Sequence, residues 1–250
     1  MGKILPLIAG NWKMHKGPKE AGGFAQELKK RVAGLTGREV VVFPSFVSLP
    51  VVAEVLRGSN ISYGAQNVFY ELKGAFTGEV SPAFLAEIGC GYVIIGHSER
   101  RNLLGETNEM CAKKIRAALS CGIRPILCCG ETLEERNRGE TFAVVERQLA
   151  GSLSGVADEA ILDIAYEPVW AIGTGHNATP EEAGRVHAWI RQWLMAHRPN
   201  TAGEMRIIYG GSVNPVNIDG LMQQEEINGV LVGGASLDVD SFVRIVNYQG

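Results

Sequence analysis

Residues 206–233 read RIIYGGSVNPVNIDGLMQQEEINGVLVG, and this stretch contains the pattern that decides the fold. It begins and ends with a short apolar run, at Arg206–Gly210 and at Gly229–Gly233. Continuously apolar runs of this length are typical of strands that are buried on both faces of a parallel sheet. Between the runs, Asn214 stands before Pro215, which is the order of an N-cap residue and a first helical residue. The stretch therefore predicts a strand, a helix and a second strand.

Six further apolar runs repeat this pattern toward the N-terminus. They are Ile4–Gly10, Glu39–Phe43, Ile61–Gln66, Tyr92–Gly96, Arg124–Cys129 and Ile161–Glu167. Helical patterns lie between them; Pro18–Val32, for example, has apolar residues at spacings of three and four. Eight strands that alternate with helices over 250 residues predict an α/β protein with a closed parallel (β/α)8 barrel. The alternative is an open doubly wound sheet, but no GxGxxG or GxxxxGK(S/T) motif follows the first predicted strand.

Capping residues mark further helix starts. Ser81 and Thr179 each precede a proline, as Asn214 does. The spacing S/T-x-x-E predicts two capping boxes, Thr132 with Glu135 and Thr179 with Glu182. We therefore expect helices to begin directly after these residues.

Composition excludes several classes of protein. Lys and Arg total 24 against 27 Asp and Glu, so the chain has no basic excess with which to bind nucleic acid. No apolar stretch approaches the roughly 20 residues that span a membrane, and the N-terminus lacks the layout of a signal peptide, so we expect a cytoplasmic protein. No linker-like segment divides the chain, and we expect a single domain over residues 1–250.

Cysteine and histidine give no sign of a metal site. The five cysteines form no CxxC pair, and we expect them to pack in the core. The histidines outside the strand ends share no ligand spacing with acidic residues; they are His15, His176, His187 and His197. The sequence therefore predicts neither a metal nor a disulfide framework.

Polar side chains follow several predicted strands at their carboxyl ends. Asn11 and Lys13 follow the first strand, His97 the fourth, and Glu167 closes the sixth. Enzymes with this barrel carry their chemistry at the carboxyl ends of the strands, so an amide, an ammonium, an imidazole and a carboxylate at one rim predict an acid–base site. The alternatives are a histidine that is satisfied in the core and a solvated surface lysine.

Two glycine pairs follow the last two strands. Gly210 and Gly211 precede Ser212, and Gly233 and Gly234 follow the eighth predicted strand. Glycine lets backbone N–H groups approach an anion, and a phosphate site after strands seven and eight is common in this barrel. The alternative is a pair of tight turns.

Two loops are longer than the barrel requires. Pro168–Ala178 has 11 residues and is largely apolar, which favours a lid over a merely long loop. Asn67–Glu79 carries Phe69, Tyr70 and Phe76, which predict a surface that a partner covers. The alternative for this second loop is packing on its own barrel.

The chain resembles the triosephosphate isomerase family from end to end. The blocks that carry the resemblance are Asn11–Lys13, Gly96–Arg101, Ala165–Gly175, Tyr209–Val213 and Gly233–Leu237. The resemblance implies a TIM barrel that interconverts dihydroxyacetone phosphate and D-glyceraldehyde 3-phosphate in glycolysis and gluconeogenesis. It also implies that no cofactor is used and that the protein is a homodimer, in which the tip of loop 67–79 near Thr77 enters the neighbouring subunit beside Met14.

The same resemblance implies a role for each site residue. Glu167 would be the base and His97 the electrophile, while Asn11 and Lys13 would support the developing oxyanion. The residues that would hold the phosphate are Asn11, Lys13, Gly173, Ser212, Gly233 and Gly234.

Two other functions are compatible with a phosphate-binding barrel. A sugar-phosphate aldolase would need a lysine that forms a Schiff base, but all nine lysines lie at or before Lys114 and only Lys13 stands at a strand's carboxyl end. A non-catalytic barrel that binds a phosphorylated metabolite would be expected to lack the base or the electrophile, whereas Glu167 and His97 are both present.

Overall fold

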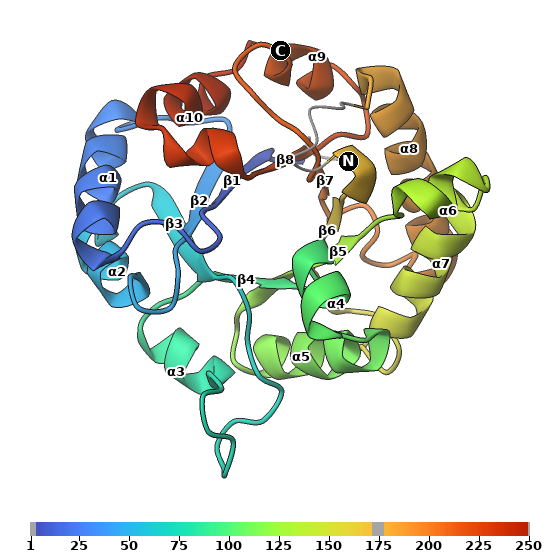
Figure 1. Ribbon diagram of the computed structural model, residues 1–250, viewed down its shortest axis with the longest axis horizontal. Helices are drawn as coiled ribbons and strands as arrows, with labels where there is room; N and C mark the ends of the chain where they lie inside the picture. Colours follow the sequence, from blue (N-terminus) through green and yellow to red (C-terminus); the bar gives the residue numbers. More distant parts are fainter. Residues whose placement is uncertain (1–3, 172–177, 250) are drawn as a thin grey trace.

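The computed structural model, which describes residues 4–171 and 178–249, is a closed barrel of eight parallel strands (Figure 1). The strands are β1 (Leu7–Asn11), β2 (Glu39–Phe43), β3 (Ile61–Ala65), β4 (Tyr92–Ile95), β5 (Arg124–Cys129), β6 (Asp163–Tyr166), β7 (Ile207–Tyr209) and β8 (Gly229–Val232). Each strand pairs with the next, and β1 also pairs with β8, which closes the sheet. The predicted (β/α)8 barrel is confirmed.

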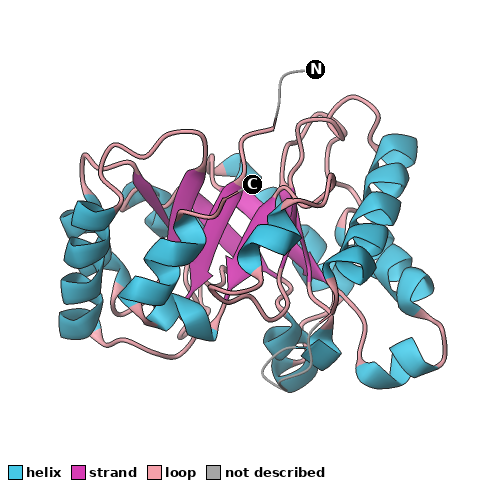
Figure 2. Ribbon diagram, turned by 90° about the horizontal axis from the view of Figure 1, so that it is seen from above, coloured by secondary structure: helices cyan, strands magenta, loops and turns pink. Residues whose placement is uncertain are grey.

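Helices surround the barrel on the outside (Figure 1), and Figure 2 shows the same arrangement turned by 90°. The α-helices are α1 (Pro18–Arg31), α2 (Leu49–Leu56), α3 (Pro82–Glu87), α4 (Ser98–Leu104), α5 (Asn108–Ser120), α6 (Leu133–Asn137), α7 (Thr141–Ser152), α8 (Pro180–His197), α9 (Ile218–Met222) and α10 (Val239–Val246). Two 3-10 helices, η1 (Val169–Ala171) and η2 (Gly234–Leu237), follow β6 and β8. None of the helices in the described ranges is long and apolar enough to cross a membrane.

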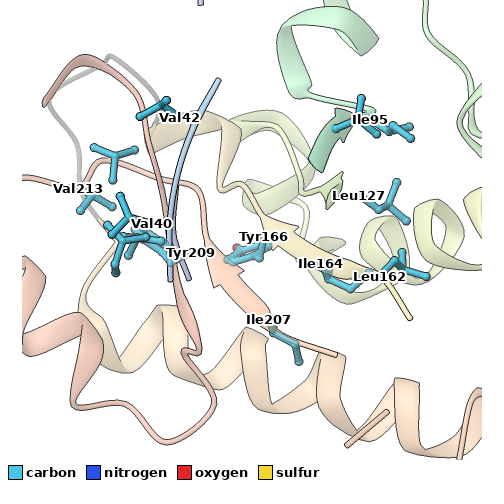
Figure 3. Packing of buried hydrophobic residues seen from close by; sticks show 14 of the residues in the cluster. Val40, Val42, Ile95, Leu127, Leu162, Ile164, Tyr166, Ile207, Tyr209 and Val213 are labelled. Carbon is cyan, nitrogen blue, oxygen red and sulfur yellow. The ribbon is translucent and has the colours of Figure 1, made fainter. Parts of the chain in front are cut away.

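The core has two layers because successive strand residues point to opposite faces of the sheet. Leu7 and Ala9 of β1 belong to the cluster inside the barrel, whereas Ile8 between them packs in the cluster beneath the helices. Figure 3 shows part of that outer layer, with Ile164 and Ile207 on neighbouring strands. Burial on both faces explains why the strands read as continuous apolar runs.

Most predicted element boundaries agree with the structure to within two residues, and two differ by more. Ser81 caps α3, and both capping boxes form, at α6 and α8. The predicted helix start at Asn214 is wrong: α9 begins at Ile218, and the Asn214 side chain instead accepts from the N–H groups of Val216 and Asn217 in the preceding turn. The first strand begins at Leu7 and not at Ile4, since Pro6 has no N–H to donate to the ladder.

Ion pairs fill the amino end of the barrel. The fully buried Asp163 carboxylate lies 2.7 Å from Arg124 and 2.9 Å from Arg206. Arg206 also lies 2.8 Å from Glu39 at the start of β2. These charges pair with one another at the end of the barrel opposite the carboxyl ends of the strands.

Candidate active site

A cavity of about 340 Å³ lies at the carboxyl ends of the strands. Seven of the predicted site residues line it: Asn11, Lys13, His97, Glu167, Ser212, Gly233 and Gly234. The eighth, Gly173, lies outside the described residues, as do residues 172–177 of the predicted lid 168–178. The structure thus brings residues from the carboxyl ends of five strands around one space.

Glu167 follows β6. It continues the alternation in which every second residue, Asp163 and then Ala165, faces the inside of the barrel. Its side chain is 2% exposed, and Oε2 accepts a hydrogen bond of 2.9 Å from the Ser98 N–H. Gly210 provides space for it, because a Cβ at Gly210 would lie 2.8 Å from Glu167 Cγ. The carboxylate is therefore oriented by one backbone donor and by the space that Gly210 leaves beside it.

His97 is the N-cap residue of α4. Its Nδ1 accepts from the Glu99 N–H at 3.2 Å, so the ring is an acceptor at Nδ1 and carries its proton on Nε2. Nε2 lies 3.2 Å from Glu167 Oε1. This arrangement presents a neutral N–H donor directly beside a carboxylate.

Lys13 has an unusual backbone conformation, with φ at 50° in the left-handed region. Asn11 Oδ1 accepts from the Lys13 N–H at 3.0 Å, and Gln66 Nε2 donates to the Lys13 carbonyl at 2.8 Å. Strained residues persist where the surrounding structure holds them, and they cluster at functional sites. Asn11 and Gln66 together hold the chain so that Lys13 points into the cavity.

The Lys13 ammonium lies 2.6 Å from Glu99 Oε1, a contact that sequence reasoning missed. Glu99 is 86 positions away, and its place in the first turn of α4 indicates only an ordinary helix-start carboxylate. Gln66 was also missed, although a polar residue at the end of a predicted strand is a readable signal. The Lys13 and Glu99 side chains are 27% and 44% exposed, so the ammonium can turn toward a ligand.

After β7 and β8, the rim of the cavity carries small residues. Gly233 and Gly234 stand at the start of η2, where helix N–H groups lack carbonyl partners within the helix. A Cβ at Gly233 would lie 3.5 Å from Lys13 Cε, so the lysine chain passes close to this rim. Ser212 is fixed from below, since Asn217 donates to its carbonyl at 2.9 Å. A cation beside small residues and backbone donors is a suitable environment for a phosphate.

A cluster behind the cavity was not predicted either. The cluster consists of four side chains next to Glu167 that interact with one another: Glu131, Tyr166, Trp170 and Arg136.

Among the residues that the structure describes, no group of three or more His, Cys, Asp or Glu side chains is placed to hold a metal ion.

Comparisons with known proteins agree on one family. The family model described as triosephosphate isomerase matches residues 6–249. A triosephosphate isomerase from Carboxydothermus hydrogenoformans is 55% identical over 244 residues, which cover 96% of this chain and 97% of the relative. One from Endomicrobium trichonymphae is 50% identical over 98% of each chain. The crystal structure of triosephosphate isomerase from Bartonella henselae superposes with a TM-score of 0.89 at 36% identity and covers 98% of both chains.

Proposed function

Because this chain belongs to the triosephosphate isomerase family and so interconverts dihydroxyacetone phosphate and D-glyceraldehyde 3-phosphate, we propose that the polar groups around its carboxyl-end cavity carry out that reaction. The observation that carries the proposal is the contact between the only carboxylate and the only imidazole among the described residues that line this cavity, Glu167 Oε1 and His97 Nε2 at 3.2 Å.

In this proposal Glu167 is the base. It takes a proton from C1 of dihydroxyacetone phosphate and returns it to C2 of the enediolate, so a single carboxylate serves both carbons. The Glu167 side chain is nearly free of water contact, which favours proton transfer to carbon over exchange with solvent.

His97 and Lys13 act on the oxygens. The His97 Nε2–H donates to the carbonyl oxygen as negative charge develops there and moves protons between the two oxygens of the enediolate. The Lys13 ammonium, supported by Asn11, stabilises the same charge and also attracts the phosphate. The remaining phosphate contacts are assigned to Ser212, Gly233 and Gly234 at the rim and, on the resemblance alone, to Gly173.

The aldolase alternative is less well supported. A Schiff base needs an uncharged lysine amine, and Lys13 is the one described lysine that lines the cavity. Its Nζ lies 2.6 Å from the Glu99 carboxylate, whereas Schiff-base lysines are activated by an apolar pocket or by a neighbouring cation.

A coupled assay tests the reaction. Protein treated with a chelator and supplied with D-glyceraldehyde 3-phosphate should form dihydroxyacetone phosphate, and the reverse assay should run to the same equilibrium. A protein that cleaves or only binds the substrate would contradict the proposal.

We further propose that the protein is a homodimer of single-domain barrels, each spanning residues 1–250, formed through loop 67–79. The loop projects from the barrel beyond α3 (Figure 1). Inside it, the Phe69 ring lies 4.2 Å from Tyr70 and 4.7 Å from Phe76 between centroids, yet Phe76 remains 42% exposed. Met14, on the segment after β1, is 94% exposed. A second copy that covers these side chains would remove an apolar surface from water.

We place the protein in the cytoplasm. The support for this proposal is the glycolytic reaction of its family.

A further inference from the structure

A buried carboxylate, Glu131, holds the chain on both sides of Glu167. Its side chain is fully buried and accepts from the Tyr166 hydroxyl at 3.1 and 3.2 Å, just before Glu167. It also accepts from the Trp170 indole at 2.9 Å, and its backbone carbonyl accepts from the Val169 N–H at 3.1 Å. Three residues within three positions of the proposed base therefore depend on the placement of Glu131.

Arg136, on α6, contacts this group from outside the barrel. Its guanidinium carbon lies 4.1 Å from the centre of the Trp170 ring, a cation–π geometry. Its Nη1 lies 3.9 Å from Glu131 Oε1 and so supplies a positive charge near the buried carboxylate. A carboxylate that is buried away from water loses its hydration, and a nearby positive charge offsets part of that cost.

The same guanidinium is anchored to α8. Arg136 Nη2 lies 2.7 Å from Glu182 Oε1, while the other oxygen of Glu182 accepts from the Thr179 N–H in the capping box. The Thr179 N–H, followed by the nearby Arg136, keeps the pKa of Glu182 below its ordinary value, so the pair stays charged at neutral pH. Figure 1 shows α6 and α8 on the same side of the barrel. One planar side chain thus joins α6, η1 and the first turn of α8.

We propose that Arg136 is a positioning residue for the isomerisation: it fixes Trp170 and Glu131, and through them the carboxylate of Glu167, against α8. The proposal rests on the proposed role of Glu167 as the base. Arg136 does not line the cavity, so its effect falls on proton transfer and not on the binding of the phosphate.

The test compares three variants in the coupled assay at saturating and limiting D-glyceraldehyde 3-phosphate. Arg136→Met should lower kcat by about tenfold to 100-fold, because a misplacement of about 1 Å costs on the order of 10² in rate. KM and inhibition by inorganic phosphate should stay within about threefold of the wild type. Arg136→Lys keeps the charge for Glu182 but loses the planar face on Trp170, and its kcat should be intermediate.

Arg138→Met is the matched control. Arg138 follows α6 two residues later and pairs with the exposed Glu134 and Glu140, at 2.7 and 2.9 Å. Its loss should leave kcat and KM unchanged. Equal kcat in Arg136→Met and Arg138→Met would overturn the proposal, as would parallel changes in kcat and phosphate inhibition. If Arg136→Met does not fold, a wild-type kcat in Arg136→Lys overturns it.

Glu167→Gln separates this inference from the proposed function. Normal turnover in Glu167→Gln would refute the role of the base itself. A slow Glu167→Gln variant together with a wild-type kcat in Arg136→Met would refute only the role of Arg136.

Discussion

The proposed base depends on space as much as on hydrogen bonds. Glu167 receives one hydrogen bond from the Ser98 N–H and stands beside Gly210, where a side chain would collide with its Cγ. Gly210 does not have a positive φ, so its backbone conformation does not require glycine. The position requires glycine because a side chain there would occupy the space of the Glu167 carboxylate.

Gly210→Ala should therefore slow the reaction without unfolding the protein. The new methyl group would lie 2.8 Å from Glu167 Cγ and displace the carboxylate, so kcat should fall by roughly tenfold to 100-fold. Steady-state kinetics measure the effect. Gly23→Ala on α1, where a Cβ meets nothing within 4 Å, is the control and should have the wild-type kcat. A wild-type kcat in Gly210→Ala would show that the carboxylate does not need this space.

Lys13 combines two roles, and its removal should reveal both. Lys13→Met should raise KM for the phosphorylated substrate and also lower kcat, because one ammonium meets the phosphate and the developing oxyanion. Lys19→Met, an exposed lysine on α1, is the control and should change neither constant. If the two variants have the same kinetics, Lys13 is an ordinary surface charge.

Among the elements, α8 holds a buried histidine against the segment before β8. His187 on α8 is fully buried, and its Nδ1 lies 3.1 Å from the Glu226 carbonyl in the segment before β8. Burial lowers the pKa of His187 to about 4. The native protein therefore holds this imidazole uncharged over a pH range in which the unfolded chain protonates it.

The free energy of unfolding should reflect this difference. The unfolded histidine has a pKa of about 6.5, so the contribution of His187 is complete above that pH and is lost as the pH falls toward about 4. The complete loss lowers the free energy of unfolding by on the order of 3 kcal/mol. Urea unfolding of the wild type and His187→Gln at pH 7 and pH 4.5, at one protein concentration, should show a smaller acid-induced loss in the variant.

His15→Gln, at an exposed histidine, should lose as much stability in acid as the wild type does. Equal losses in His187→Gln and the wild type would show that His187 is not the titrating group.

Local patterns predicted the elements well and their long-range contacts poorly. Five strands were predicted with their start residue correct and their end residue within one position, including Tyr92–Ile95 and Gly229–Val232, because burial on both faces leaves a continuous apolar run. Thr179 and Thr132 cap their helices because a capping box is complete within four residues. Asn214 failed because the same side chain stabilises a turn as readily as a helix start.

The candidate site was predicted in part for the same reason. Asn11 and Glu167 could be placed at the rim because each ends a readable strand. Glu99 and Arg136 could not, since their partners are distant in the sequence and only the closed barrel brings them together. Contacts of this kind are properties of the tertiary structure and leave no local pattern.

At the scale of the whole molecule, loop 67–79 determines the expected assembly. Phe76→Asp and Thr77→Asp should each separate the subunits, because a charge buried without a partner at an interface costs several kcal/mol. Activity should fall as well, although every proposed catalytic residue remains. Sedimentation velocity with parallel assays measures both effects.

Met195→Asp, an α8 residue as exposed as Phe76 at 42%, is the control and should remain dimeric. A fully active wild-type monomer would contradict the dimer, and a fully active monomeric variant would contradict its link to catalysis.

The most direct test of the central claim is kcat for Glu167→Gln in the coupled assay, run in both directions on folded protein beside the wild type. We expect kcat to fall by roughly 10² to 10⁴, because a positioned general base contributes about that much. Glu181→Gln, at an exposed carboxylate in the first turn of α8, should keep the wild-type kcat. Turnover in Glu167→Gln close to that of the wild type would mean that another group moves the proton, and the site proposed for this barrel would be wrong.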